Sequence, residues 1–263
     1  MNFCISNIAW NKNETNLVLK LLKDKGIHYL EYSPNLLLNN NFSKKKIKSV
    51  KKYWNDKRFK LYSMQSILYK KKNAYLFGNK LQKKIFLKEV EKKIRIAKSL
   101  GSKVIVFGSP TSRKVFNHKR DKLNELSYEM FSKVAKLSMK YKVCFCLEAN
   151  PKIYKTKYLT HTNESIDMVK KINNKYFKIN LDLGTIIANK ENFRFIINNN
   201  LKFIGHVQIS SPHLKNLLNY KKKIDVFVKT LKNIGYKKVI SFEMLRNNKN
   251  NLDVIKKVLE QKN

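Results

Sequence analysis

The sequence predicts an α/β protein built as one closed (β/α)8 barrel. Three observations predict it: strand-length apolar runs recur eight times, helical patterns separate them, and no composition break divides the 263 residues. A single barrel of this kind is typically about 250 residues long. The 43% of hydrophobic residues is enough to bury a large core. We therefore expect residues 1–263 to form one domain.

The eight predicted strands are short and lie at barrel-like intervals. They are NFCISNI (2–8), IHYLEYS (27–33), KLYSMQS (60–66), KVIVFGS (103–109), VCFCLEA (143–149), FKINLDL (177–183), FIGHVQIS (203–210) and KVISFEM (238–244). An open doubly wound sheet is the alternative fold. Its usual GxGxxG signature after the first strand is absent from the sequence. The longest predicted connection, 66–86, is placed to cover the barrel mouth.

Helical spacing of apolar residues marks the connecting segments, for example 87–101 and 123–141. Gly26, Gly101 and Gly235 each follow such a pattern and precede a strand. Glycines just past a helix C-terminus have this placement. The pattern thus alternates helix and strand through the whole chain.

Alternate residues of a strand point to opposite faces, so parity predicts which side chains face the barrel axis. In the fifth strand, Cys144, Cys146 and Glu148 share one face, and in the seventh His206 and Gln208 do. The apolar residues between them form the other face. We expect the polar set to point inward and the apolar set to pack against the helices.

The formal charge of +39 suggests a nucleic-acid partner at first sight. Only six of the 57 basic residues are arginine, the residue preferred for forked phosphate contacts. The lysines spread over nearly every predicted helix beside abundant asparagine and isoleucine, which share A/T-rich codons. Biased base composition explains this excess, and we expect no nucleic-acid partner.

Nothing at the N-terminus indicates secretion. MNFCISNIAW reads as a first strand, without a basic start or a cleavage site, and no apolar run approaches the roughly 18 residues of a membrane span. Cys144 and Cys146 share a strand face, where they cannot easily form a bridge, and no partner ligands at zinc-site spacing accompany them. We expect a cytoplasmic protein with reduced cysteines and no membrane partner.

Four oxygen-bearing side chains end four consecutive predicted strands in the second half of the chain: Glu148, Asp182, Gln208 and Glu243. Parallel strands of a barrel present these ends at one mouth, where polar residues are typically catalytic. Three carboxylates buried together are costly unless a cation or protons compensate. Oxygen donors favour one Mg²⁺ or Mn²⁺ ion over Zn²⁺, which usually takes imidazole or thiolate ligands. This mouth quartet therefore predicts a divalent-metal site.

On these residues the chain resembles the sugar phosphate isomerase/epimerase family, the xylose-isomerase-like TIM barrels that include ketose 3-epimerases. The resemblance covers essentially the whole length. It rests on ISNIAW (5–10), SMQSILY (63–69), VIVFGSP (104–110), LEANP (147–151), LDLG (181–184), HVQIS (206–210) and SFEM (241–244).

The resemblance implies a metal-dependent isomerase or epimerase acting on a sugar or sugar phosphate by proton transfer next to a carbonyl, through an enediolate. The mouth quartet would hold the metal, and Glu148 and Glu243 would also be the catalytic acid and base on opposite faces of the substrate. Relatives often form dimers or tetramers, so a homo-oligomer is an open expectation.

Four further residues are candidates for binding the substrate. Gln65, Arg113 and Asn150 sit in matching strand-end segments and could bind sugar hydroxyls or a phosphate. His213, in the loop after the seventh strand, could reach the mouth. His206 lies one layer below Gln208 and is expected to support the site or the core rather than bind the metal.

Two positions depart from the family pattern. The third metal ligand is usually histidine and here is Gln208, and many epimerases carry histidine where this chain has Thr185. A non-catalytic sugar-binding barrel is therefore an alternative. A nuclease akin to endonuclease IV is another, but it requires a histidine-rich multi-zinc cluster, and this chain has five histidines.

Overall fold

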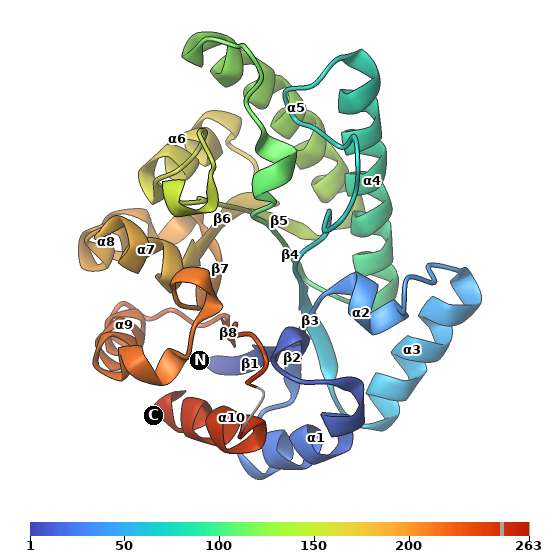
Figure 1. Ribbon diagram of the computed structural model, residues 1–263, viewed down its shortest axis with the longest axis vertical. Helices are drawn as coiled ribbons and strands as arrows, with labels where there is room; N and C mark the ends of the chain where they lie inside the picture. The colour runs from blue at the N-terminus through green and yellow to red at the C-terminus, as the bar shows by residue number, and fades with distance from the viewer. Residues whose placement is uncertain (248–249, 263) are drawn as a thin grey trace.

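Eight parallel strands close into a barrel in the computed structural model, which describes residues 1–247 and 250–262. Neighbours in the chain are neighbours in the sheet, and β8 pairs with β1 to close it (Figure 1). The strands are β1 (Asn2–Ser6), β2 (Tyr29–Tyr32), β3 (Lys60–Met64), β4 (Val104–Phe107), β5 (Cys144–Glu148), β6 (Phe177–Asp182), β7 (Ile204–Ile209) and β8 (Val239–Phe242). The predicted barrel and all eight predicted strands are confirmed.

The helices surround this ring of strands (Figure 1). They are α1 (Thr15–Asp24), α2 (Pro34–Leu38), α3 (Lys44–Asp56), α4 (Lys80–Leu100), α5 (Arg120–Tyr141), α6 (Thr162–Ile172), α7 (Leu183–Asn189), α8 (Phe193–Asn200), α9 (Lys221–Asn233) and α10 (Asn251–Leu259). None of the helices in the described part of the chain is long and apolar enough to cross a membrane.

Local sequence signals explain where the longest connection ends. The side chains of Asn79 and Gln82 exchange hydrogen bonds with each other's backbone N–H groups, 3.0 Å each, and this capping box starts α4 at Lys80. The connection after β3 therefore ends at residue 79, and residues 80–86, predicted as its last part, belong to α4. This connection packs against the loop after β4, since the N–H of Leu76 donates to the carbonyl of Ser112.

The three predicted helix-end glycines all adopt left-handed backbone conformations. Gly26, Gly101 and Gly235 have φ values of 66°, 89° and 74°. A side chain is disfavoured there, and glycine lets each chain turn from helix into strand.

Parity along the strands divides the core into two layers, as predicted. Outside the sheet, Phe145 packs against Phe107 and Phe177, and both of these also contact Phe131 of α5. Inside the barrel, a small separate cluster contains Val104, Val106 and Cys146, with Tyr62 and Cys144 against it. The three cysteines are free thiols. The inner face is thus available for polar side chains toward the mouth.

Candidate active site at the barrel mouth

The mouth quartet lies at the carboxyl ends of four adjacent strands. Asp182 of β6 pairs in register with Gln208 of β7, and Glu148 of β5 pairs with Asn180 one layer below Asp182. The N–H of Glu243, just after β8, donates to the carbonyl of Ile209 at 2.9 Å and continues the pairing of β7 and β8. The barrel therefore brings the four predicted side chains to one end, as the sequence predicts.

Glu148 is held from two sides by amide groups. Its Oε1 accepts from Asn150 Nδ2 at 3.2 Å, and its Oε2 accepts from Asn180 Nδ2 at 2.8 Å. Gly108, directly after β4, leaves room for this carboxylate, since a Cβ there would come within 2.7 Å of Oε1. Burial, and then the negative charge of Asp182, raise the pKa of Glu148 to about 8.

Asp182 lies at the barrel mouth and is also the N-cap residue of α7. Its Oδ2 accepts from the Thr185 N–H at 2.8 Å and from the Thr185 hydroxyl at 3.0 Å, and its Oδ1 accepts from Ser210 Oγ at 2.6 Å. Burial raises the pKa of Asp182 despite these bonds. Thr185, where many epimerases have histidine, therefore positions Asp182 in this chain.

Glu243 completes the acidic mouth. Burial raises its pKa well above the ordinary value, and the charges of Glu31, Glu148 and Asp182 raise it further. Glu243 lies at the same end of the barrel, since it follows β8 directly and its N–H is bonded to Ile209 of β7. Three mutually repelling carboxylates are thus concentrated at one end of the barrel.

The sequence analysis missed Glu31, which lies inside the barrel on β2. Its side chain is 0% exposed and accepts hydrogen bonds from four partners on β3, β7 and β8. These are Ser63 Oγ at 2.8 Å, His206 Nε2 at 3.0 Å, Gln208 Nε2 at 2.8 Å and Ser241 Oγ at 2.9 Å. Burial would raise the pKa of Glu31, but the bond and charge of His206 and the other donors hold it lower. His206 thus lies below the mouth against Glu31, in the supporting position predicted for it.

Asn180 is a second residue that the sequence analysis missed. Its Nδ2 donates both to Glu148 Oε2 and to Gln208 Oε1. It therefore links β5 and β7 across β6, just below the mouth. Asn180 has the same parity as Asp182 two residues later, which is the signal that could have identified it.

The family follows from the sequence match over this barrel. A family model described as xylose isomerase-like TIM barrel matches residues 19–261. The chain belongs to this family. No curated protein sequence shows a significant match to the chain.

Solved structures of the same architecture cover nearly the whole chain. The 3-keto-D-glucoside 4-epimerase YcjR from E. coli is 15% identical, with a TM-score of 0.78 over 99% of this chain and 98% of that one. An L-ribulose 3-epimerase is 17% identical, with a TM-score of 0.79 over 97% and 91%. The IolI protein, solved with a bound zinc atom, is 16% identical, with a TM-score of 0.73 over 100% and 98%. At these identities the likeness establishes the xylose isomerase-like fold.

The donor types at the mouth fit a hard divalent ion. The carboxylates of Glu148, Asp182 and Glu243 and the amide oxygen of Gln208 are all oxygen donors, which suit Mg²⁺ or Mn²⁺. Within residues 1–247 and 250–262, however, no three His, Cys, Asp or Glu side chains are grouped as a metal cluster. Burial raises the pKa values of Glu148 and Glu243, and neighbouring negative charges raise them further.

Two of the predicted substrate-binding residues, Gln65 and Asn150, lie just after the carboxyl ends of strands and are buried. Gln65 follows β3, and its Nε2 donates to Ser6 Oγ at 3.0 Å. Asn150 follows β5 and binds Glu148 as described above. Their direct contact with a substrate stays a prediction.

The other two predicted substrate-binding residues, Arg113 and His213, differ in how much of their side chains is exposed to solvent. Arg113 is 0% exposed and donates to the backbone carbonyls of Gly108 and Leu159, so it joins two loops in an arrangement that does not favour a substrate contact. His213 is exposed, and its N–H donates to Tyr154 Oη at 2.9 Å while the two rings meet edge to face. Burial raises the pKa of Tyr154, and the charges of Asp182, Glu148 and Glu243 raise it further.

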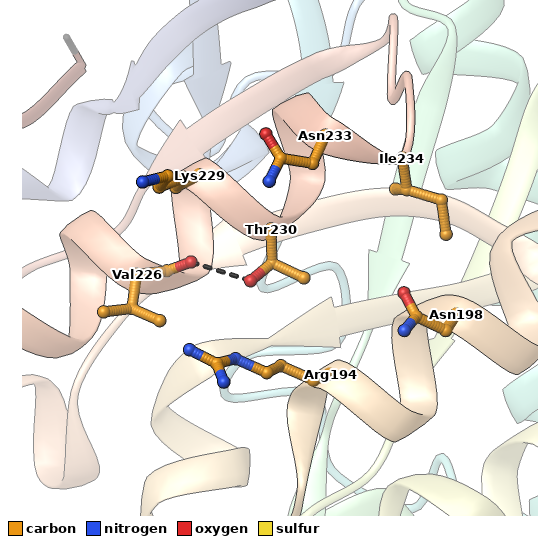
Figure 2. Close-up of a pocket in the computed structure, with 7 residues that line it drawn as sticks. All are labelled: Arg194, Asn198, Val226, Lys229, Thr230, Asn233 and Ile234. Atoms are coloured by element: carbon orange, nitrogen blue, oxygen red, sulfur yellow. Dashed lines mark hydrogen bonds between the residues drawn. The ribbon is translucent and has the colours of Figure 1, made fainter.

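A separate cavity of about 510 Å³ lies on the outer helical ring (Figure 2). Residues of α8 and α9 and the residue that follows α9 line it: Arg194, Asn198, Val226, Lys229, Thr230, Asn233 and Ile234. The Thr230 hydroxyl donates to the carbonyl of Val226 within it, at 2.8 Å. This lining includes none of the mouth quartet, so the cavity belongs to a different part of the molecule.

Proposed function

We propose that this chain is a divalent-metal-dependent isomerase or epimerase acting on a sugar or sugar derivative in the cytoplasm. The observation that carries the proposal is the acidic mouth, where Glu148 and Asp182 end β5 and β6 and Glu243 directly follows β8. All three carboxyl groups are in a setting that raises their pKa values, mainly through burial. Membership of the xylose isomerase-like family and the epimerases among its structural neighbours support this chemistry.

Glu148 and Glu243 are the proposed acid and base. The pKa of Glu148 is raised to about 8, and a carboxyl group with a pKa near neutrality can both release and accept a proton at working pH. Burial also raises the pKa of Glu243. Asn150 and Asn180 fix the orientation of Glu148 through its two oxygens. One glutamate would remove a carbon-bound proton, and the other would return a proton to the resulting enediolate.

The mouth quartet would hold the metal ion. When bound, a divalent ion polarises a substrate carbonyl and stabilises negative charge that develops on its oxygen. Asp182 is kept in place by Thr185 and Ser210, and Gln208 by Glu31 and Asn180. Gln65 and His213 remain candidates for contacts with substrate hydroxyl groups.

Metal binding and proton exchange test the proposal. Titration of the purified protein with Mn²⁺ should give one ion per chain, lost in Asp182→Ala. The protein should then catalyse exchange of a carbon-bound proton with solvent in a panel of ketoses, aldoses and their phosphates. Glu148→Gln and Glu243→Gln should each reduce turnover by about 10²–10⁴-fold with the fold intact. Glu125→Gln, on the outer face of α5, is the matched control.

The same measurements distinguish the alternatives. Near-wild-type turnover in either mouth glutamate variant would exclude the proposed acid–base pair. Absence of binding at millimolar Mn²⁺ would favour a non-catalytic sugar-binding barrel. More than one zinc ion per chain would favour a nuclease.

A further inference from the structure

Glu31 is a fully buried carboxylate with four hydrogen-bond donors that the proposed chemistry does not use. It is buried inside the barrel, and its four hydrogen-bond donors come from across the barrel as well as from the next strand. Each Glu31 oxygen accepts two of them: Oε2 from Ser63 and His206, and Oε1 from Gln208 and Ser241. A carboxylate held in this way by surrounding strands has a fixed position.

The bond to Gln208 has a direction. A glutamine amide has a donor end and an acceptor end, whereas a carboxylate only accepts hydrogen bonds. With Nε2 bound to Glu31 Oε1 at 2.8 Å, Gln208 Oε1 lies at the opposite end, where it meets Asn180 beside Glu148. Reversal of the amide would set two oxygen atoms against each other in the buried interior.

We propose that Glu31 is a positioning residue that fixes the amide of Gln208, so that its oxygen, and not its NH₂ group, is available to a cation at the mouth. The inference rests on the proposed function for the identity of the ligand. It assigns a role to a residue outside the mouth quartet, whose carboxylate is hydrogen-bonded to four other side chains. The role resembles that of the carboxylates that orient metal-binding histidines by accepting their second N–H.

This role explains how glutamine can occupy a position where a histidine is usual in the family. A histidine binds a metal through the ring nitrogen that carries no hydrogen, and a partner of its other N–H fixes that tautomer. A glutamine binds through its amide oxygen, and an unanchored amide can present its NH₂ group instead. Glu31 removes this ambiguity, because it requires an N–H from the residue at position 208. The carboxylate inside the barrel and the amide at its mouth then function as a pair.

The affinity for Mn²⁺ tests the pair without reference to activity. In Glu31→Gln, residue 31 can rotate its own amide, and the orientation of Gln208 then depends on its bond from Asn180 alone. We expect Mn²⁺ to bind about 10–100-fold more weakly, as is typical when a group that orients a metal ligand is lost. Ser241→Ala is the matched control, since it removes another donor to the same Glu31 oxygen and leaves Gln208 bound.

A double-mutant cycle separates positioning from the simple loss of a negative charge. Because Gln208→Ala removes the amide, Glu31→Gln should change the Mn²⁺ affinity less than twofold in that background. An equal loss in both backgrounds would overturn the proposal, because charge alone would then explain it. An affinity of Glu31→Gln within twofold of wild type would also overturn it.

A second measurement needs neither a folded variant nor a bound metal ion. It therefore tests the proposal even if Glu31→Gln does not fold or the wild type does not bind Mn²⁺. In the ¹⁵N spectrum of the wild-type protein, the Gln208 side-chain NH₂ should exchange with solvent at least 100-fold more slowly than that of exposed asparagines such as Asn219. Exchange at the exposed rate would show that Glu31 does not hold this amide. Wild-type protein with a protected Gln208 amide but no Mn²⁺ binding would refute the proposed metal function and leave the positioning intact.

Discussion

At the scale of single residues, Glu148 predicts an unusual dependence of stability on pH. Burial beside Asp182 raises its pKa to about 8, so the folded metal-free protein retains a proton that the unfolded chain releases near pH 4.5. The folded state therefore binds more protons between these values, and the free energy of unfolding falls as pH rises through this window. Below pH 4.5 both states are protonated and this penalty is absent.

Replacing Glu148 by glutamine should remove this penalty. We expect Glu148→Gln to stabilise the metal-free protein at pH 8 by roughly 1–3 kcal/mol, less than the full pKa difference implies because solvent reaches part of the group. At pH 4.5 the variant and the wild type should be nearly equal. Urea unfolding in EDTA at both pH values measures this, with Glu125→Gln as control. A destabilised variant at pH 8 would contradict the prediction.

The outcome at single residues also shows what the sequence could reveal about the site. Glu148, Asp182, Gln208 and Glu243 were predictable because each follows an apolar run that had to be a strand. Glu31 was missed because it lies inside strand β2, between Leu30 and Tyr32, rather than after the last residue of the strand. Its significance depends on Ser63, His206 and Ser241, which only closure of the barrel brings around it.

At the scale of helices and strands, the spacing of apolar residues predicted the long amphipathic helices and missed the short ones. Helix α5 has a sustained apolar stripe and was predicted, whereas α2 and α7 have five and seven residues. Such short helices depend on caps and tertiary contacts, as α7 depends on Asp182. The start of α4 was placed too late because its capping box was not recognised.

That capping box gives a prediction for α4. In Asn79→Ala, the N–H of Gln82 loses its acceptor, and we expect the free energy of unfolding to fall by about 1 kcal/mol. Lys80→Ala, one residue later on the exposed surface, should change it by less than about 0.5 kcal/mol. Chemical denaturation of both variants measures the difference. Equal effects would mean that the cap contributes nothing beyond a surface change.

At the scale of the whole molecule, the chain has too few acidic residues to neutralise its basic ones. The chain has 57 basic and 18 acidic residues, so ion pairs can neutralise only a minority of the lysines. Several acidic residues are moreover used inside the barrel or at its mouth, as Glu31 and Asp182 are. The lysine surface therefore repels itself, and this repulsion opposes the compact state.

Salt should relieve this repulsion. The Debye length shortens from about 30 Å at 0.01 M salt to about 10 Å at 0.1 M, which screens most pairs of surface lysines from each other. We expect the free energy of unfolding to rise by about 1 kcal/mol between 0.01 and 0.3 M NaCl. Urea unfolding across this range measures the effect, and sucrose at equal osmolality controls for general solute effects. If stability fell with salt, favourable ion pairs would outweigh lysine repulsion, and the basic surface would be an organised network rather than an excess of like charge.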